Sequence, residues 1–217
     1  MKYDLIIVAS SSTKRLIELT QSCIDSARVD NSDLNIIIVE TFQKYNYEGC
    51  TIIPYKGEFN YNKCLNLGLQ HAQGDYHILA NNDIYFHKGW SEIGYLMQNN
   101  GYESACAISD YHYKKGIEHG DYVYEGYDIG ILLCGWCIFV SRKCIQMIGK
   151  LDESFEFWHS DNVYGDQLHA LGIKHVLFCN IQVDHVASQT LKTLPFRKQR
   201  KYSWDSVRKY QLLRYAK

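Results

Sequence analysis

Short apolar runs alternate with longer segments of helical periodicity in the first part of the chain. Residues 5–9 and 34–39 are apolar and rich in β-branched side chains, which is typical of buried parallel strands. Between them, from about Lys14, apolar side chains recur at the three- and four-residue spacing of a helix. This order predicts a right-handed parallel unit. Glu40 closes the second strand with a carboxylate, which can accept hydrogen bonds from a ribose or a base.

The alternation continues with a short strand and a second helix. Residues 51–54 are apolar and predict the strand, and the helix is expected to run from Asn60 to near Gly74. Asn62 and Asn66 lie four positions apart, so they share one face of that helix. A capped surface helix explains this pattern without any functional role.

A further apolar run, residues 76–84, ends in the polar cluster Asn81, Asn82 and Asp83. Open α/β sheets bind their ligands at the carboxyl ends of their strands, and oxygen-bearing side chains at such a position suit a divalent cation. Ordinary turn chemistry explains the same residues without a ligand. Residues 84–90 are expected to lead into another helix.

The second half of the chain is less regular at its start. Residues 101–130 alternate tyrosines, glycines and charges, and are expected to form an irregular lid, part of an acceptor surface, or an edge hairpin. The later pattern predicts a strand over residues 134–142 and a short helix over 143–148. It then predicts a helix over 164–171, which Gly172 ends, and a strand over 175–179. One basic, aromatic helix is expected over 197–217.

Composition and charge exclude several classes of protein. The 217 residues are 46% hydrophobic and carry a formal net charge of -1, so no general attraction to nucleic acid or anionic membranes is expected. The tail from Lys192 to Lys217 is the exception, since it is locally basic. No run is long enough to span a bilayer, and the first residues suit a strand better than a signal peptide.

Eight cysteines are scattered along the chain, mostly among apolar residues. This distribution favours reduced, buried thiols in a cytoplasmic protein over a disulfide framework. Cys134 and Cys137 have Cys-X-X-Cys spacing, but no second pair lies nearby to complete a zinc site.

Several motifs, taken in their order, resemble those of family 2 glycosyltransferases. They are Asn62-X-X-X-Asn66-X-Gly68, the strand end Asn81-Asn82-Asp83 in place of an Asp-X-Asp metal motif, the strand that starts at Cys134, Asp161 at the start of a helix and the late His185. The resemblance implies a GT-A fold: one α/β domain with a mixed, mostly parallel sheet flanked by helices. It implies a domain over 1–190, with a nucleotide-sugar half (1–100) and an acceptor half (101–190), followed by the tail 191–217.

The resemblance also implies roles for individual residues. Asp83 and His185 would bind Mn²⁺ or Mg²⁺, Asp161 would be the catalytic base, and the nucleotide sugar would contact Ala9, Ser10, Glu40, Asn62, Asn81 and Asn82. The implied reaction moves a sugar from a nucleoside-diphosphate donor to an acceptor hydroxyl, with inversion at the anomeric carbon. Trp136 and Trp158 are candidate sugar platforms, or plain core aromatics.

Two other functions fit the same residues. A nucleotidyltransferase also binds a cation through carboxylates, but it would show a glycine-rich loop where Ser10, Ser11 and Ser12 stand. A binding module without catalysis agrees with Asn81 in place of the first motif Asp, and with Ser160 where the family has Glu. The acceptor stays open between a saccharide precursor, a soluble protein or small molecule, and a nucleic-acid base that carries a hydroxyl.

Overall fold

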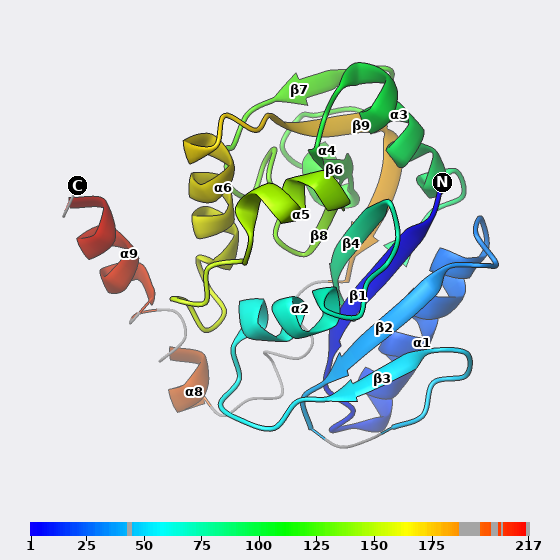
Figure 1. The fold of residues 1–217 in the computed structure, drawn as a ribbon, viewed down its shortest axis with the longest axis vertical. Helices are drawn as coiled ribbons and strands as arrows, with labels where there is room; N and C mark the ends of the chain where they lie inside the picture. Colours follow the sequence, from blue (N-terminus) through cyan, green and yellow to red (C-terminus); the bar gives the residue numbers. More distant parts are fainter. Residues whose placement is uncertain (43–44, 187–195, 201–203, 205, 216–217) are drawn as a thin grey trace.

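A nine-stranded sheet runs through the centre of the chain, with helices on both of its faces (Figure 1). A computed structural model describes residues 1–42, 45–186, 196–200, 204 and 206–215. The strand order is β3-β2-β1-β4-β8-β6-β9-β5, and β7 pairs with β9. The strand pairings make β8, β7 and β5 antiparallel to the others, so the sheet is mixed and mostly parallel.

The strands have the following bounds: β1 (Tyr3–Ala9), β2 (Asn35–Glu40), β3 (Thr51–Pro54), β4 (Tyr76–Asn81), β5 (Ile84–Phe86), β6 (Ser104–Ile108), β7 (Val123–Glu125), β8 (Cys137–Ser141) and β9 (His175–His185). The helices are α1 (Lys14–Arg28), α2 (Tyr61–Leu69), the 3₁₀ turn η1 (Trp90–Glu92), α3 (Ile93–Asn100), α4 (Asp110–Tyr113), α5 (Arg142–Ile148), α6 (Ser160–Ala170), α8 (Phe196–Arg200) and α9 (Ser206–Tyr215). Among the described residues, no helix has the length and apolar character needed to cross a bilayer.

Successive residues of the central strands point to opposite faces and build two apolar layers. Leu5 packs in the layer that holds Ile24 of α1, whereas Ile6 packs in the layer that holds Leu65 of α2. Helix α2 approaches the sheet closely at Gly68, where an added Cβ would collide with Ile6. The continuous apolar strands are therefore explained by burial on both faces.

The first half of the fold confirms the pattern-based predictions. Strands occupy the expected runs, and α1 begins at Lys14, with Thr13 as its N-cap. Strand β1 pairs in parallel with both β2 and β4. The carboxyl end of β4 carries Asn81, Asn82 and Asp83, as expected.

Residues 101–130 were predicted to be irregular, and this prediction was wrong for residues 104–108. Ser104–Ile108 form β6, which is fully buried between β8 and β9. The strand was missed because Ala105, Cys106 and Ala107 are small and not β-branched, and they lie between tyrosine-rich turns. Val123–Glu125 form β7 at an edge of the sheet.

Several element boundaries also differ from the prediction. Residues 84–90 contain β5 before the turn into η1 and α3, helix α6 starts at Ser160, and β9 continues past Cys179 to His185. Strand pairing explains the first and last differences, because Ile84 lies opposite His185. The described part of 197–217 contains two helices, α8 and α9, instead of one; Ser206, a residue type favoured at helix starts, opens α9.

The helix predicted to reach Gly74 ends at Leu69, because Asp4 fixes the turn that follows it. The Asp4 carboxylate is 2% exposed and accepts hydrogen bonds from Gln73 N at 2.7 Å, from Gly74 N, and from Asn35 Nδ2 at 2.6 Å. His77 Nδ1 lies 3.2 Å from Asp4 Oδ2. Burial raises the pKa of Asp4, but these neighbours more than offset it, so the pKa lies below its ordinary value.

We expect Asp4→Ala to lower the free energy of unfolding by at least about 3 kcal/mol, because it leaves buried donors without an acceptor. The pKa of Asp4 is depressed by folding, so its contribution is present at neutral pH and is lost as the pH falls through the folded pKa. Urea unfolding at a series of pH values measures both effects. The exposed Asp75→Ala is the matched control and should change stability by only about 0.5 kcal/mol. Equal losses in both variants would contradict the role of Asp4.

Candidate functional site

A cavity of about 310 Å³ opens beside the carboxyl ends of β1 and β4. A cavity of this size suits a small-molecule site. Its wall includes four of the predicted site residues, namely Asn62, Asn81, Asp161 and His185, together with Trp136 and Trp158. Ala9, Ser10, Glu40, Asn82 and Asp83 lie outside this wall, on the adjoining part of the same sheet edge.

Asp83 and His185 form a close pair at one side of the cavity. Asp83 Oδ1 lies 3.1 Å from His185 Nε2, and the Asp83 side chain is 4% exposed. Strand pairing fixes both residues, since Ile84 pairs with His185 and Val186 N donates to the carbonyl of Asp83 at 3.0 Å. The two predicted metal ligands, far apart in sequence, are therefore adjacent.

Asn81 lies beside the Asp83–His185 pair, whereas the Asn82 side chain is bound elsewhere. Asn81 Nδ2 lies 3.4 Å from His185 Nε2, so this amide, in either orientation, presents a polar atom beside the pair. Asn82 is buried and donates to Thr20 Oγ1 at 3.0 Å, which ties β4 to α1. One carboxylate, one imidazole and one amide are a donor set that suits Mn²⁺. The described residues contain no group of three His, Cys, Asp or Glu that could hold a metal, so further ligands would have to come from a diphosphate or water.

Glu40 organises the turn that follows β1. Its carboxylate accepts hydrogen bonds from Ser11 N at 2.9 Å, Ser11 Oγ at 2.6 Å and Phe42 N at 3.0 Å. Ala9 lies opposite Glu40 in the strand pairing, and its carbonyl accepts a bond from Thr41 Oγ1 at 2.8 Å. These bonds from described residues hold the Glu40 carboxylate against the turn. The predicted contact of Glu40 with a nucleoside stays a prediction.

Asp161 stands in the first turn of α6 and lines the same cavity as His185. Burial raises the pKa of its carboxyl above the ordinary value, although backbone N–H groups of Asn162 and Gly135 act in the opposite direction. Gly135 is required for this packing, because a Cβ there would lie 2.8 Å from the Asp161 Cβ. A carboxylate with a raised pKa that faces a cavity is suited to accept a proton.

His159, which precedes this turn, is the one non-glycine residue with a positive φ in the described chain, at 68°. Its Nδ1 lies 2.9 Å from Asn162 Oδ1, and its ring stacks on Tyr210 of α9 at 5.0 Å. Left-handed backbone at a non-glycine residue is strained and often occurs at functional sites. No pattern in the sequence points to this residue, because its backbone conformation arises from the tertiary contacts of the turn.

Aromatic side chains form the wall between these polar groups. Trp136 stacks on His185 with a centroid distance of 5.1 Å and an interplanar angle of 16°, and Tyr111 meets Trp136 edge-on. Trp158 is 41% exposed and also lines the cavity. Both tryptophans line the cavity, and Trp136 also packs against the two core layers, so its role as a sugar platform stays a prediction. Tyr111 places α4, from the segment expected to be a lid or acceptor surface, at the same wall.

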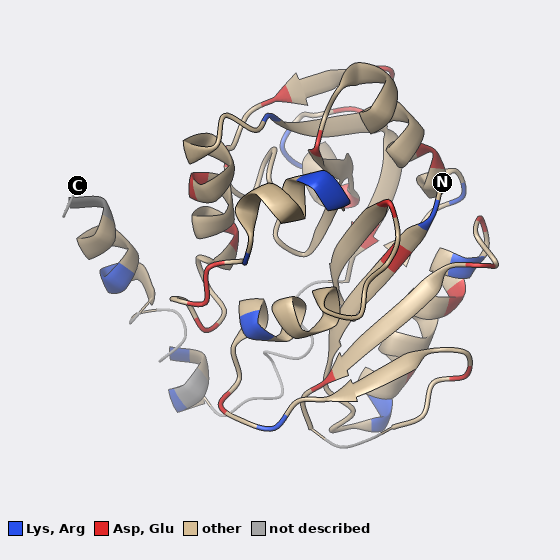
Figure 2. Cartoon of the chain, viewed as in Figure 1, with Lys and Arg blue, Asp and Glu red and all other residues tan. Residues whose placement is uncertain are grey.

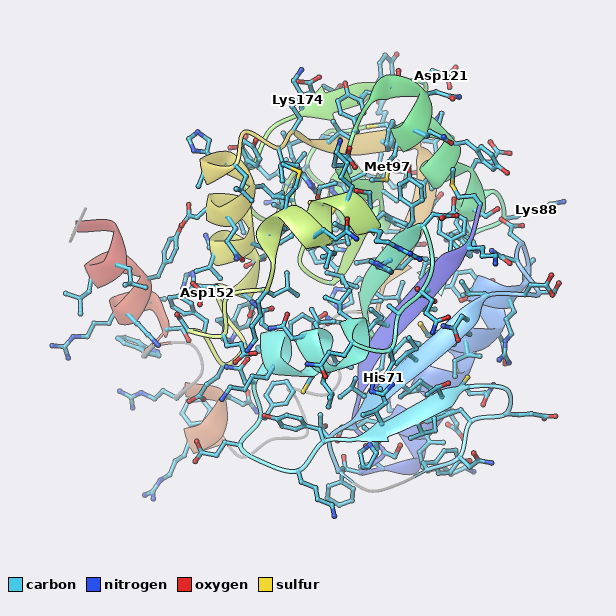
Figure 3. The ribbon with its side chains drawn as sticks, in the orientation of Figure 1. His71, Lys88, Met97, Asp121, Asp152 and Lys174 are labelled. Carbon is cyan, nitrogen blue, oxygen red and sulfur yellow. The ribbon has the colours of Figure 1, made fainter. Side chains whose placement is uncertain are left out.

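The asparagines of α2 and the one just before its start bind the loop that precedes α6. Asn62 Nδ2 donates to the carbonyl of Asp152 at 2.6 Å, and Asn60 Nδ2 donates to the carbonyl of Glu153 at 2.9 Å. Asn66 both donates to the Leu151 carbonyl and accepts from Leu151 N. Figure 3 shows Asp152 in the loop beside α2. The shared face of Asn62 and Asn66 is thus buried against the loop before α6, and the reading of a capped surface helix was wrong.

The cysteines give no support to zinc or redox chemistry. All eight are free thiols, as predicted, and Cys134 and Cys137 are buried. Burial raises the pKa of both thiols, which opposes the thiolate form that metals and disulfide exchange require.

Solved structures of glycosyltransferases share this fold. They include GalNAc-T7 with UDP, GalNAc and Mn²⁺ (TM-score 0.68, 10% identity, 85% of this chain and 43% of that chain). They also include the mannosyltransferase PcManGT from Pyrobaculum calidifontis with GDP-Man and Mn²⁺ (TM-score 0.64, 9% identity, 87% of this chain and 57% of that chain). A third is S. aureus TarS (TM-score 0.65, 10% identity, 87% of this chain and 37% of that chain). The chain spans 37% to 57% of the length of these three proteins.

Neither a protein-family model nor a curated protein sequence matches the chain. At about 10% identity the structural likeness shows the fold alone. It confirms the predicted GT-A fold, an α/β domain with a mixed, mostly parallel sheet flanked by helices.

We expect Asp161→Asn to stabilise the protein at neutral pH. The pKa of Asp161 is raised by folding, so ionising this carboxyl costs stability as the pH rises through that range. An uncharged amide avoids this cost, and the gain should disappear at low pH, where wild-type Asp161 is protonated. Thermal unfolding of both proteins from acidic to neutral pH measures the difference. Asp121→Asn, at an exposed site, is the control and should show no such pH-dependent gain. A destabilised Asp161→Asn protein at neutral pH would contradict the argument.

Proposed function

We propose that the protein is a metal-dependent glycosyltransferase that moves a sugar from a nucleoside-diphosphate donor to an acceptor hydroxyl. The observation that carries this proposal is the arrangement of the cavity within a GT-A fold. The Asp83–His185 pair, of which His185 lines the cavity, and the Asp161 carboxylate, with its raised pKa, meet at this one cavity. A donor held at the pair would present its anomeric carbon towards Asp161.

The Asp83–His185 pair, with Asn81 beside it, would hold the cation. A divalent cation that also binds the diphosphate supplies Lewis-acid stabilisation of the negative charge on the leaving group. The mixed oxygen and nitrogen donors favour Mn²⁺, and Mg²⁺ is the alternative. The crystallised neighbours GalNAc-T7 and PcManGT contain Mn²⁺ with UDP or GDP-Man, which supports a cation and a nucleoside-diphosphate donor here.

The nucleoside would lie along the edge formed by β1, β2 and β4. Ala9 and Ser10 provide the backbone at the end of β1, and the Glu40 carboxylate would accept a hydrogen bond from a ribose or base. Asn62 and Asn81 line the cavity on the donor side, whereas Asn82 acts through the Thr20 contact that fixes the strand end. In this proposal Glu40 and Asn82 mainly position the donor site.

Asp161 would act as the general base. As the acceptor oxygen forms its bond to the anomeric carbon, the bond from that carbon to the diphosphate oxygen breaks, and its electron pair leaves with the diphosphate. The proton of the acceptor hydroxyl moves to the Asp161 carboxylate. Direct attack with a single base inverts the anomeric configuration. Trp136 and Trp158 offer aromatic faces against which the apolar face of a sugar ring can pack.

Asp161→Asn should reduce turnover by about 10²–10⁴-fold, because the amide cannot accept the proton. The affinity for the nucleotide should stay close to that of the wild type, since the nucleotide would be held at the Asp83–His185 pair and not by Asp161. Single-turnover kinetics combined with nucleotide binding separates the two effects. A proportional loss of nucleotide affinity and turnover would contradict the base assignment.

Calorimetry with UDP, GDP, CDP and TDP, each with and without Mn²⁺, tests the donor half. One nucleotide should bind with Mn²⁺, and Asp83→Ala should abolish the Mn²⁺-dependent part of its affinity. Asp184→Asn is a matched control, because Asp184 pairs with His87 at 2.7 Å on the same β5–β9 pairing but does not line the cavity. If no nucleotide binds under any condition, the proposed function is wrong.

A further inference from the structure

The C-terminal segment differs in charge from the rest of the chain. Residues 192–217 contain nine Lys and Arg and one Asp, a net charge of +8, whereas residues 1–191 carry -9. Figure 2 shows basic positions on both α8 and α9. Concentration of positive charge in one segment indicates an anionic partner, because solubility alone does not require the two signs of charge to be separated along the chain.

Helix α9 places this charge at the mouth of the cavity. The Tyr210 ring stacks on His159, which lines the cavity, and Tyr210 OH donates to Asp166 Oδ2 of α6 at 3.2 Å. Lys209 Nζ lies 5.2 Å from the centre of the Phe155 ring and donates to the carbonyl of Ser154. These contacts fix the basic helix beside the wall where the acceptor would enter.

Exposed aromatic rings accompany the cations. Trp204 is 70% exposed and lies under the Arg200 guanidinium at 5.5 Å, and Phe196 is also exposed. Cations with interleaved, exposed aromatic rings are typical of surfaces that bind a nucleic-acid strand, where phosphates meet Lys and Arg and bases stack on rings.

A membrane surface would require a different arrangement of the same residues. An interfacial helix gathers its apolar side chains on one face and its charges on the other. Seen down the axis of α9, Leu212 lies about 140° from Val207, and Leu213 lies about 100° beyond Leu212. At the same spacing, Arg208 lies between Val207 and Leu212, and Lys209 lies between Leu212 and Leu213. The side chains described for α9, residues 206–213, therefore form no single apolar face, and the observations favour nucleic acid.

We infer that the acceptor is carried on a nucleic acid, with α8 and α9 binding the phosphate backbone and one base entering the cavity. The inference rests on the proposed glycosyl transfer, in which a hydroxyl on that base would be the attacking group. Enzymes that modify a base within a strand hold it between aromatic or apolar side chains. The rings of Tyr111, Trp136 and Trp158 at the cavity provide such surroundings.

Binding is tested with fluorescein-labelled oligonucleotides of about 20 nucleotides, as single-stranded and duplex DNA and RNA, by anisotropy. The wild type should bind at least one of them, and its affinity should fall steeply between about 50 and 200 mM salt. The variant Arg197→Gln/Arg200→Gln/Arg208→Gln should weaken binding at least about tenfold and reduce the salt slope, because phosphate contacts are lost. Sedimentation with phosphatidylglycerol vesicles runs in parallel.

The matched control is Lys2→Gln/Lys88→Gln/Lys174→Gln, which removes three exposed cations away from α8 and α9. Figure 3 shows Lys88 and Lys174 on the part of the molecule remote from both helices. Its affinity should stay within about twofold of the wild type, although its net charge changes equally. Equal losses in the two triple variants would overturn the inference.

The remaining outcomes separate this inference from the proposed function. A wild type that binds a nucleoside diphosphate with Mn²⁺ but no oligonucleotide overturns the inference alone. Binding to vesicles without binding to oligonucleotides also overturns it and assigns the segment to a membrane. Salt-dependent oligonucleotide binding that requires the three arginines supports the inference, whereas the same binding with a donor half rejected by calorimetry leaves a nucleic-acid surface and overturns the acceptor role.

Discussion

The hydrogen bonds between α2 and the loop before α6 are the constraint on which the cavity depends. Asn60, Asn62 and Asn66 use their amides to hold the backbone at residues 151–153. Each of these amides is buried, so an unmade bond would carry the full desolvation cost of its polar atoms. This contact holds the loop before α6 against α2, and both α2 and the first turn of α6 line the cavity.

The polar residues of the site fall into two groups that the sequence alone does not distinguish. His185, Asn81 and Asp161 face the cavity, whereas Asn82 and Glu40 face inward and fix the strand ends. Apart from Asp161, which opens α6, the members of both groups stand at or just after the carboxyl ends of strands. Inward-facing carboxylates and amides are stable there because backbone N–H groups and hydroxyls satisfy them. A strand end of this kind therefore requires as many supporting polar residues as ligand-facing ones.

Much of the fold could be predicted, because long apolar strands and capped helices leave clear periodic signals. The parallel half, with β1, α1 and β2, is determined by local pattern. Strand β6 was not predicted, because small residues such as Ala105 have little strand preference of their own and pack well only between β8 and β9. The Asp83–His185 pair was anticipated from motif order, but its geometry comes from β5 and β9, which pair across about a hundred residues of sequence. The strain at His159 and its stack on Tyr210 could not be predicted, since both arise from tertiary contacts.

The β5–β9 pairing has a consequence for how such a site can change over time. His185 is the last residue of β9, and Asp83 lies in the turn directly before β5, where its carbonyl accepts a hydrogen bond from Val186 N, so backbone bonds and not the two side chains place this pair. A change of His185 to a carboxylate would alter the hardness of the donor set without rebuilding the scaffold. If this pair holds the proposed cation, the two side chains would set the choice of metal, while the backbone bonds that place them stay the same.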